Sequence, residues 1–329
     1  MSAGSERKAG RHTADVELMG ICMRALIVDH AQPSGLRLGD VPPPTRGPGE
    51  VLVEVGAFAL NNGDLATAID MGDGDVPGWE AAGYVIEAAG DGSGPAVGTP
   101  VTTFGVTGAW AEYRAVDVGM LGTAPKGADL AAISTVPVAA NSALRALRRS
   151  GPTLGRRIMI TGATGGVGRY AIQLARMAGA QPVAVTRYPD EFADELRGLG
   201  ADAVIADPAD CPDPVHTVID TVGGPLLVRA FDRLDNGGVL IALGHLATGA
   251  ESFPRGALMA GPGQNRTIVS FHQFDGTPLG PDFTWLSEQL TRGALLPSIN
   301  WRGSWQHVHD AITALRRGTL HGKAVIDLR

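Results

Sequence analysis

The segment from Arg157 to Tyr170, RIMITGATGGVGRY, constrains this chain more than any other. It predicts a short buried strand, a turn of nearly bare backbone and a helix start, with glycine at positions 162, 165, 166 and 168. A pyrophosphate reaches the N–H groups of a helix start only where no Cβ blocks it, and glycine also permits the tight turn. The apolar strand before the turn and the apolar periodicity after it favour a dinucleotide site over a glycine turn without a ligand.

Composition narrows the class of protein. The chain has 329 residues and a formal net charge of −7, which disfavours nucleic acid or an anionic membrane as a partner. Its two cysteines, Cys22 and Cys211, give no disulfide framework, so we expect a reducing, cytoplasmic location. No apolar run reaches the roughly 18 residues that a membrane-spanning helix needs.

Strands and helices alternate in the middle of the chain. We expect strands at 157–162, 182–187, 203–206, 216–220, 238–243 and 266–271, and helices at 131–149, 166–179, 189–199 and 224–234. This alternation predicts an α/β fold, a doubly wound parallel sheet of the Rossmann type with helices on both faces.

The flanking regions have a different character. From Met23 to about Thr123, short apolar or alternating runs are broken by Gly and Pro, which indicates a β-rich region. The tail shows helical patterns at 283–291 and 305–317 and a last strand at 323–328. We therefore predict a disordered extension over 1–22, a β-rich substrate domain over 23–129 and 272–329, and a dinucleotide-binding domain over 130–271.

The end of the second predicted strand bears on the cofactor. An NAD site commonly places Asp or Glu about 20 residues after the glycine turn to bind the ribose hydroxyls. Here Thr186 and Arg187 stand at that place, and Asp190 and Glu191 come several residues later. A hydroxyl and a cation suit the extra phosphate of NADPH, so we expect NADPH; the alternative is that Arg187 is a solvated surface residue.

The order of motifs resembles the medium-chain dehydrogenase/reductase superfamily, and within it the zinc-independent quinone oxidoreductase and enoyl reductase branch. The segments that carry the resemblance are GLRLGDVPPPTRGPGEVLVEV, VPGWEAAGYV, GAWAEYRAV, GATGGVG, DTVGGPLL and HGKAVIDL. They cover nearly the whole chain from Met23 onwards. The resemblance implies a GroES-like catalytic domain beside the Rossmann-type domain, a small-molecule substrate, and a homodimer formed through the edge of the nucleotide-domain sheet.

Two residues argue against a catalytic zinc ion. Zinc-dependent relatives carry a Cys in the first domain and a His in a Gly-His-Glu segment, and here Asn61 and Trp79 fall at those places. An indole donates a hydrogen bond but does not ligate a metal, and the eight His residues show no ligand spacing. We therefore expect no metal.

The resemblance also implies residues of the cofactor site. The expected cofactor-binding residues are Gly162 and Thr164, Gly165, Gly166, Val167 and Gly168 of the turn, Thr186 and Arg187, and Thr221, Gly223, Leu243, Gly244, Phe271 and Lys323. For Lys323, a structural ion pair is an equally open interpretation.

The catalytic side chains are less sharply defined. Related reductases often carry a Tyr two residues after the Asp of an Asn-x-x-Asp segment, but Ala66 stands there in this chain. The remaining candidates are Asn61, which could instead stabilise a turn; Asp64, which could instead cap a helix; and His245, which could instead be an ordinary loop residue. Trp79 and Trp110 could line an apolar pocket or pack in the core.

Without a metal, hydride from the nicotinamide passes most easily to a quinone or to an α,β-unsaturated carbonyl, since both spread the developing negative charge. We therefore expect an NADPH-dependent, zinc-independent oxidoreductase. Two alternatives stay open: a specialised biosynthetic reductase for one bulky ketide-type intermediate, and a non-catalytic NADPH-binding protein.

Overall fold

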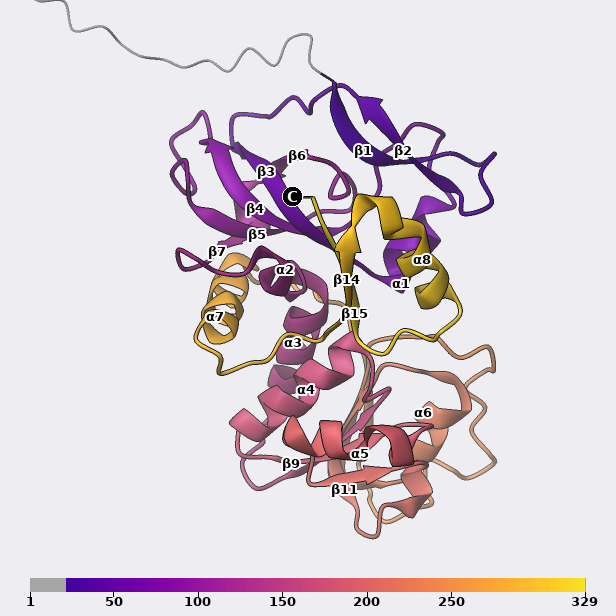
Figure 1. Ribbon diagram of the computed structural model, residues 1–329. Coiled ribbons are helices and arrows are strands. Elements are labelled where there is room, and N and C mark those ends of the chain that lie inside the picture. Colours follow the sequence, from indigo (N-terminus) through magenta and orange to yellow (C-terminus); the bar gives the residue numbers. More distant parts are fainter. Residues whose placement is uncertain (1–21, 329) are drawn as a thin grey trace, which may run out of the picture.

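The computed structural model describes residues 22–328, so the extension predicted over 1–22 lies outside the described residues apart from Cys22. Figure 1 shows two large sheets, one in the upper and one in the lower half of the molecule. The upper sheet has seven strands and the lower sheet has six. None of the helices within residues 22–328 is both long and apolar enough to span a bilayer.

The seven-stranded sheet is built from both ends of the chain, in the order β14-β15-β3-β4-β5-β7, with β6 also paired to β3. Its strands are β3 (Glu50–Leu60), β4 (Glu80–Glu87), β5 (Pro100–Phe104), β6 (Tyr113–Asp117), β7 (Leu121–Thr123), β14 (Ile299–Ser304) and β15 (Lys323–Asp327). A hairpin of β1 (Met23–Val28) and β2 (Leu36–Val41) and the helix α1 (Asn62–Ala68) flank it.

The tail enters this sheet because β15 pairs antiparallel with β3. The pattern of Lys323–Asp327 predicted that strand. It did not predict β14, whose residues alternate between half-buried and exposed and so present no buried apolar run.

The six-stranded sheet confirms the predicted α/β class. Its order is β10-β9-β8-β11-β12-β13, and every pairing in it is parallel. The strands are β8 (Arg157–Thr161), β9 (Gln181–Val185), β10 (Ala203–Ile205), β11 (Val215–Asp220), β12 (Leu234–Ala242) and β13 (Thr267–Ser270). The order reverses between β8 and β11, and in open parallel sheets ligands bind at the carboxyl ends of the strands beside such a reversal.

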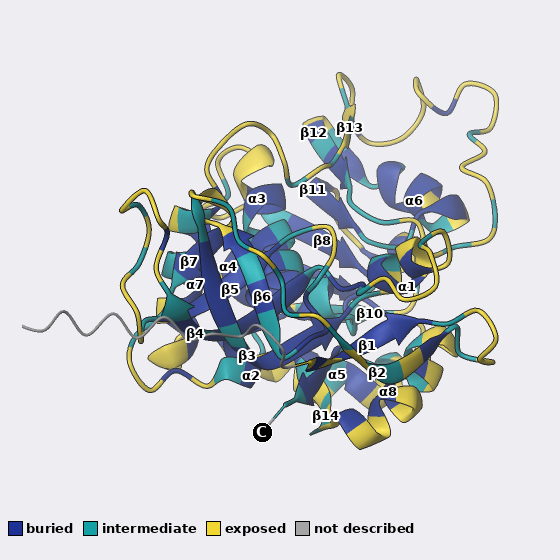
Figure 2. Cartoon of the chain, turned by 90° about the horizontal axis from the view of Figure 1, so that it is seen from above, coloured by how far each residue is buried: buried dark blue, intermediate teal, exposed yellow. Residues whose placement is uncertain are grey.

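Helices cover the sheets and connect their strands. They are α2 (Leu130–Ile133), α3 (Asn141–Arg149), α4 (Gly166–Met177), α5 (Pro189–Gly198), α6 (Gly224–Phe231), α7 (Gly280–Thr291) and α8 (Val308–Arg316), with short helical turns η1 (Val118–Met120), η2 (Val136–Ala140), η3 (Pro208–Asp210) and η4 (Trp305–His307). Figure 2 shows the strands mostly buried and the outer sides of the helices exposed.

The helix predicted at 131–149 is interrupted. The structure has α2, the π-helical turn η2 and α3 in its place, because Pro137 has no N–H to continue the helical ladder. The boundaries proposed at 129/130 and 271/272 remain predictions, and α2 packs on the seven-stranded sheet through Ala131, in one cluster with Ala57, Ala59 and Val325.

One hydrophobic cluster joins the two sheets. It contains Phe104 and Ala82 of the seven-stranded sheet together with Ile160 and Ile219 of the six-stranded sheet. Partly buried residues that pack against it include Trp79, Val138, Val167, Leu243 and Phe271. Trp110 instead lies fully buried in a separate cluster with Phe58, so it is a core residue.

Candidate active site

The glycine turn lies between β8 and α4, as its sequence predicted. Gly162 has φ +62°, and a Cβ there would lie 2.3 Å from Thr221 Oγ1. A Cβ on Gly168 would lie 2.4 Å from Gly162 O, so α4 can approach the turn only without one. Arg169 N donates to Gly165 O at 3.0 Å, which leaves the N–H groups of Gly166, Val167 and Gly168 ahead of the helical ladder. This backbone fits a dinucleotide diphosphate, which binds such N–H groups at a helix start.

The turn is fixed from two sides by residues that sequence reasoning did not single out. Arg169 Nε donates to Thr164 O at 2.8 Å, and its guanidinium is also paired with Glu195. His321 Nδ1 lies 3.3 Å from Thr164 Oγ1, and its ring centroid lies 4.6 Å from that of Phe192. Arg169 directly follows the last glycine of the motif and His321 lies far along the chain, and only the tertiary fold shows that both side chains contact Thr164.

Beside the turn, the end of β9 presents a hydroxyl and a cation. Thr186 is buried and its Oγ1 accepts from Tyr188 N at 3.3 Å, whereas Arg187 is exposed. The Arg187 guanidinium lies 5.5 Å from the centre of the Tyr188 ring, and no carboxylate within residues 22–328 forms an ion pair with it. Tyr188 in turn packs edge-on against His321, 5.8 Å between centroids. A phosphate on the adenosine ribose would find this cation uncompensated.

A buried polar cluster lies next to the turn. The Lys323 side chain comes from β15 across Gly166, where a Cβ would lie 2.7 Å from Lys323 Cδ. Its Nζ donates to Leu60 O at 2.8 Å, to Asn61 Oδ1 at 2.5 Å and to Glu80 Oε1 at 2.7 Å. Three acceptors satisfy the three N–H groups of the ammonium, so Lys323 forms a structural ion pair and also touches the proposed cofactor turn.

Asn61 and Glu80 complete this cluster. Asn61 Nδ2 donates to Glu80 Oε1 at 2.9 Å and to Asp64 Oδ2 at 3.1 Å. Glu80 Oε2 accepts from Val138 N at 2.8 Å, which ties the start of β4 to η2. Glu80 is fully buried and Lys323 nearly so. The structure thus brings the predicted residues Asn61, Asp64 and Lys323 together.

Asp64 is buried, with 1% of its surface exposed. Its Oδ2 accepts from the backbone N of Asn61 at 3.1 Å, so Asp64 does cap α1, while its Oδ1 has no hydrogen-bond partner among the described residues. Burial raises the pKa of Asp64 to about 8, against the opposing charge of Lys323. Burial also disfavours the charged form of Arg114, which interacts electrostatically with Asp64 and Glu80, and so lowers the pKa of its guanidinium to about 10.

This donor set does not fit a zinc ion. The Oδ1 of Asn61 already accepts from an ammonium, and the Trp79 indole offers no lone pair to a metal. Within residues 22–328, no three His, Cys, Asp or Glu side chains gather as metal ligands would.

The remaining predicted cofactor residues meet at the carboxyl edge of the six-stranded sheet. Thr221 Oγ1 donates to Thr161 O at 2.9 Å, and Gly223 N donates to Asp220 Oδ2 at 2.8 Å. A Cβ on Gly244 would lie 2.7 Å from Thr221 O, so these two loops are in contact. Leu243 and Phe271 follow the neighbouring strands β12 and β13.

His245 also lies at the carboxyl edge of the six-stranded sheet, but its hydrogen-bond partner is Glu251 and not a residue of the polar cluster. Its Nδ1 is 2.8 Å from Glu251 Oε1, which also accepts from Gly224 N at 2.8 Å at the start of α6. The backbone hydrogen bond from Gly224 is the main cause that lowers the pKa of Glu251. The His245 side chain is 59% exposed, and no contact between it and Asn61 or Asp64 is present among the described residues.

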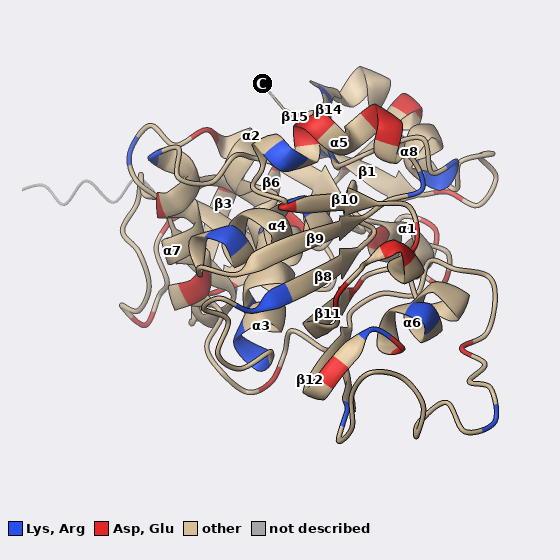
Figure 3. Cartoon of the chain, turned by 90° about the horizontal axis from the view of Figure 1, so that it is seen from below, with Lys and Arg blue, Asp and Glu red and all other residues tan. Residues whose placement is uncertain are grey.

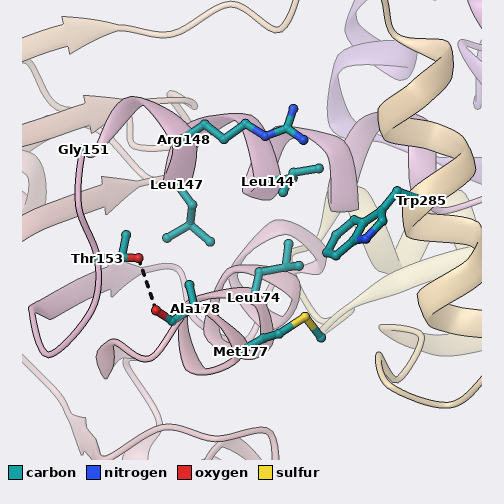
Figure 4. A pocket seen from close by; sticks show the side chains of 9 residues that line it. All are labelled: Leu144, Leu147, Arg148, Gly151, Thr153, Leu174, Met177, Ala178 and Trp285. Carbon is teal, nitrogen blue, oxygen red and sulfur yellow. Dashed lines mark hydrogen bonds between the residues drawn. The ribbon is translucent and has the colours of Figure 1, made fainter.

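An apolar cavity of about 380 Å³ lies elsewhere, near the C-terminal end of α4, whereas the glycine turn lies at its N-terminal end. Figure 4 shows the residues that line this cavity. Leu144 and Leu147 of α3, Leu174 and Met177 of α4 and Trp285 of α7 are among the side chains that line it. Leu174 and Met177 come 8 and 11 residues after Gly166 in α4, so the cavity lies roughly 12–16 Å from the turn along the helix and is not the cofactor site.

Comparisons with known proteins match both halves of the chain. The family described as "Alcohol dehydrogenase GroES-like domain" matches residues 47–126, and the family described as "Zinc-binding dehydrogenase" matches residues 166–277. The chain belongs to the medium-chain dehydrogenase/reductase superfamily, whose oxidoreductases bind nicotinamide cofactors.

The individual relatives share less than a third of their residues with this chain. The chain is 28% identical to a 2-methylene-furan-3-one reductase of Solanum lycopersicum, over 99% of this chain and 84% of the relative. It is 28% identical to an NADPH-dependent alkenal/one oxidoreductase of Arabidopsis thaliana, over 84% and 72% of the two chains. Among solved structures, the quinone oxidoreductase from Coxiella burnetii has a TM-score of 0.81 at 22% identity, over 94% of this chain and 100% of that one, which shows the shared fold.

Proposed function

We propose that this protein transfers hydride from NADPH to a quinone or an α,β-unsaturated carbonyl without the help of zinc. The observation that carries this proposal is the contact between Gly166 of the glycine turn and Lys323, whose ammonium pairs with Glu80 beside Asn61. The cradle for the cofactor thereby adjoins a buried polar cluster that lacks Cys and His. The names of the enone-reducing and quinone-reducing relatives support the same reaction class.

NADPH, when bound, supplies the hydride. The N–H groups at the start of α4, from Gly165 to Gly168, would hold its diphosphate, and Thr186 and Arg187 its ribose phosphate. Thr221, Gly223, Leu243, Gly244 and Phe271 would line its nicotinamide half. The unpaired cation of Arg187 supports NADPH over NADH.

On the acceptor side, the half-exposed Asn61 is the candidate contact residue, and Asp64 and Lys323 hold its amide in place. Hydride addition to an enone carbon moves an electron pair onto the carbonyl oxygen, and a proton then completes the saturated ketone. His245, exposed and oriented by Glu251, is the candidate proton donor at the carboxyl edge of the sheet.

The test is NADPH oxidation by the full-length protein with a panel of quinones and enones, repeated with NADH and repeated after dialysis against a chelator with the metal content measured. The proposal expects turnover with NADPH that survives metal removal. Loss of turnover on chelation with recovery on adding zinc would contradict it. Tight NADPH binding without turnover on any acceptor would favour a narrow ketide-type substrate or a non-catalytic protein.

We also propose a homodimer formed through β13, the edge strand of the six-stranded sheet, where Ile268 is 42% exposed. Light scattering coupled to size exclusion would give the mass of two chains; the mass of one chain would contradict it. A cytoplasmic location is supported by the two free cysteines, Cys22 and Cys211.

A further inference from the structure

The segment 271–279 crosses from one sheet to the other. It leaves the end of β13 in the six-stranded sheet and leads into α7. Thr284 of α7 accepts from Thr123 N of β7 at 3.1 Å, so α7 is docked on the seven-stranded sheet. Interactions that hold the segment 271–279 in place therefore also hold the side chains of that segment in place.

Arg145 of α3 holds the crossover along its length. Its side chain is only 3% exposed, and its Nη1 donates to Gln273 O at 2.7 Å and to Asp275 Oδ1 at 3.0 Å. Nη2 donates to Pro278 O at 2.8 Å and Nε to Asp282 Oδ2 at 2.8 Å. Figure 3 shows basic residues on α3, and of these Arg148 and Arg149 make the outer ion pairs to Asp282 and Asp275. Arg145 alone among the three binds backbone carbonyls of the crossover.

The crossover carries the first half of a continuous aromatic series. The ring centroids of His272 and Phe274 are 5.2 Å apart, those of Phe274 and Phe104 are 5.0 Å apart, and those of Phe104 and Trp79 are 6.4 Å apart. We call these four side chains the aromatic wall. Gln273, whose carbonyl Arg145 binds, lies between two of its members.

The wall ends beside the polar cluster. The Trp79 ring lies against Gly63 of α1, where a Cβ would be only 2.2 Å from it, and Trp79 immediately precedes Glu80. Trp79 and Phe274 are partly exposed, while Phe104 is buried between them. Trp79 is therefore the ring beside the polar cluster that holds Asn61, the candidate acceptor contact, and Phe274 offers a second accessible ring on the far side of Phe104.

We propose that Arg145 is a positioning residue which holds the crossover so that the aromatic wall is complete, and that this wall selects acceptors with an aromatic ring conjugated to the reacting double bond. The inference rests on the proposed function for the reaction and adds the class of acceptor. Ring faces and edges attract one another beyond the area they bury, so we expect an aryl acceptor to be favoured about three- to tenfold over an aliphatic one.

The test compares two enones that differ mainly in the ring, 4-phenyl-3-buten-2-one and 3-penten-2-one, by the ratio of their kcat/KM values with NADPH. The wild type should favour the aryl enone, chiefly through KM, and Phe274→Leu should remove most of that preference. Phe253→Leu is the matched control, since Phe253 packs edge-on against Phe231, outside the aromatic wall.

Arg145 is tested by the conservative Arg145→Lys and, should that variant fold poorly, by Asp275→Asn, which removes one of its partners. Either change should lower the aryl preference, and neither should lower it further in a Phe274→Leu background, because Arg145 acts through the wall. Asp207→Asn, which removes an exposed partner of Arg229, is the control.

The outcomes separate the two proposals. Turnover of both enones with an unchanged ratio in Phe274→Leu, or additive effects in the double variant, would overturn the wall and leave the proposed reaction standing. If the wild type reduces neither these enones nor any quinone or enone of the panel, the proposed function fails. Calorimetry of the two enones on the NADP⁺-loaded protein then still decides whether the wall binds the aryl compound more tightly, and equal affinities would overturn the wall.

Discussion

At the scale of single residues, Asp64 is the side chain whose chemistry the fold alters most. Only 1% of the surface of Asp64 is exposed, and its Oδ1 has no hydrogen-bond partner among the described residues. The folded protein therefore holds the proton on Asp64 up to about pH 8, whereas the ordinary pKa of an aspartic acid side chain is 3.8. The stabilisation from this bound proton is fully present below the unfolded pKa and is lost as pH rises toward the folded pKa.

We therefore predict that Asp64→Asn becomes progressively more stable relative to the wild type as pH rises from about 5 to about 8, by up to about 1.4 kcal/mol per pH unit. Urea unfolding at the two pH values measures this. Asp70→Asn, at an exposed position just after α1, is the control and should show no such trend. Equal shifts for the two variants at both pH values would show that Asp64 ionises normally.

Arg187 is the residue on which the proposed preference for NADPH depends. Its guanidinium has no ion-pair partner within residues 22–328, so its charge remains available to a phosphate. We predict that Arg187→Ala weakens NADPH binding about tenfold or more and leaves NADH binding nearly unchanged. Calorimetric titration with both cofactors measures this.

Arg156→Ala is the matched control, because Arg156 is also exposed but precedes β8, at the amino edge of the same sheet. If both variants lose the same affinity, or if Arg187→Ala weakens NADPH and NADH alike, Arg187 does not read the ribose phosphate.

At the scale of elements, the start of α4 depends on close approach of helix and turn. A Cβ on Gly168 would meet backbone atoms of Gly162 and Ala163 at 2.4 and 2.7 Å, which cannot move aside as a flexible side chain could. We predict that Gly168→Ala destabilises the protein by about 1–3 kcal/mol and weakens NADPH binding at least about tenfold.

Gly198 of α5 provides the contrast, since a Cβ there meets nothing within 4 Å. Gly198→Ala should stabilise the protein by about 0.5–1 kcal/mol and leave NADPH binding unchanged. Equal effects of the two substitutions on cofactor affinity would contradict the role of the turn.

Three neighbouring strands meet in the polar cluster, since Lys323 begins β15, Asn61 follows β3 and Glu80 begins β4. We predict that Lys323→Met costs about 3–5 kcal/mol of stability, because it leaves the buried Glu80 carboxylate without its cation. The double variant Lys323→Met with Glu80→Gln should recover part of that loss. Urea unfolding of the single and double variants is the measurement, with the exposed Lys126→Met as control; a double variant less stable than Lys323→Met would refute the pairing.

The hydrophobic periodicity of the sequence predicted most of the helices and strands. It failed where an element depends on pairing with a distant part of the chain. The alternation of strands and helices predicted five strands of the six-stranded sheet to within two residues at each end. β12 begins four residues before its predicted start, because Asp235, Asn236 and Gly237 interrupt the apolar run at its beginning. β14 was missed because its pairing with β15, rather than its composition, makes it a strand. Pro137 could have predicted the interruption of the helix at η2. The apolar periodicity of 131–149 continues through Pro137, so the segment was predicted as one helix.

At the scale of the whole molecule, the site divides in the same way. The positions of the glycine turn and of Thr186 and Arg187 in the fold could be predicted, because the turn is one continuous segment and the two residues follow the next strand. The polar cluster could not, since Lys323 is separated from Leu60 by 263 positions and from Glu80 by 243. His321 on the turn and Arg145 on the crossover were missed for the same reason.

We have proposed that the cofactor bound at the glycine turn passes hydride to the acceptor with no metal in the site. The most direct test is to supply NADPH deuterated at the transferable C4 position to protein whose metal content has been removed and measured, together with an enone, and to locate the label by mass spectrometry. We expect one deuterium on the β-carbon of the saturated ketone, formed at the same rate before and after metal removal. Product without that label, or a reaction that stops on metal removal and resumes with zinc, would contradict it.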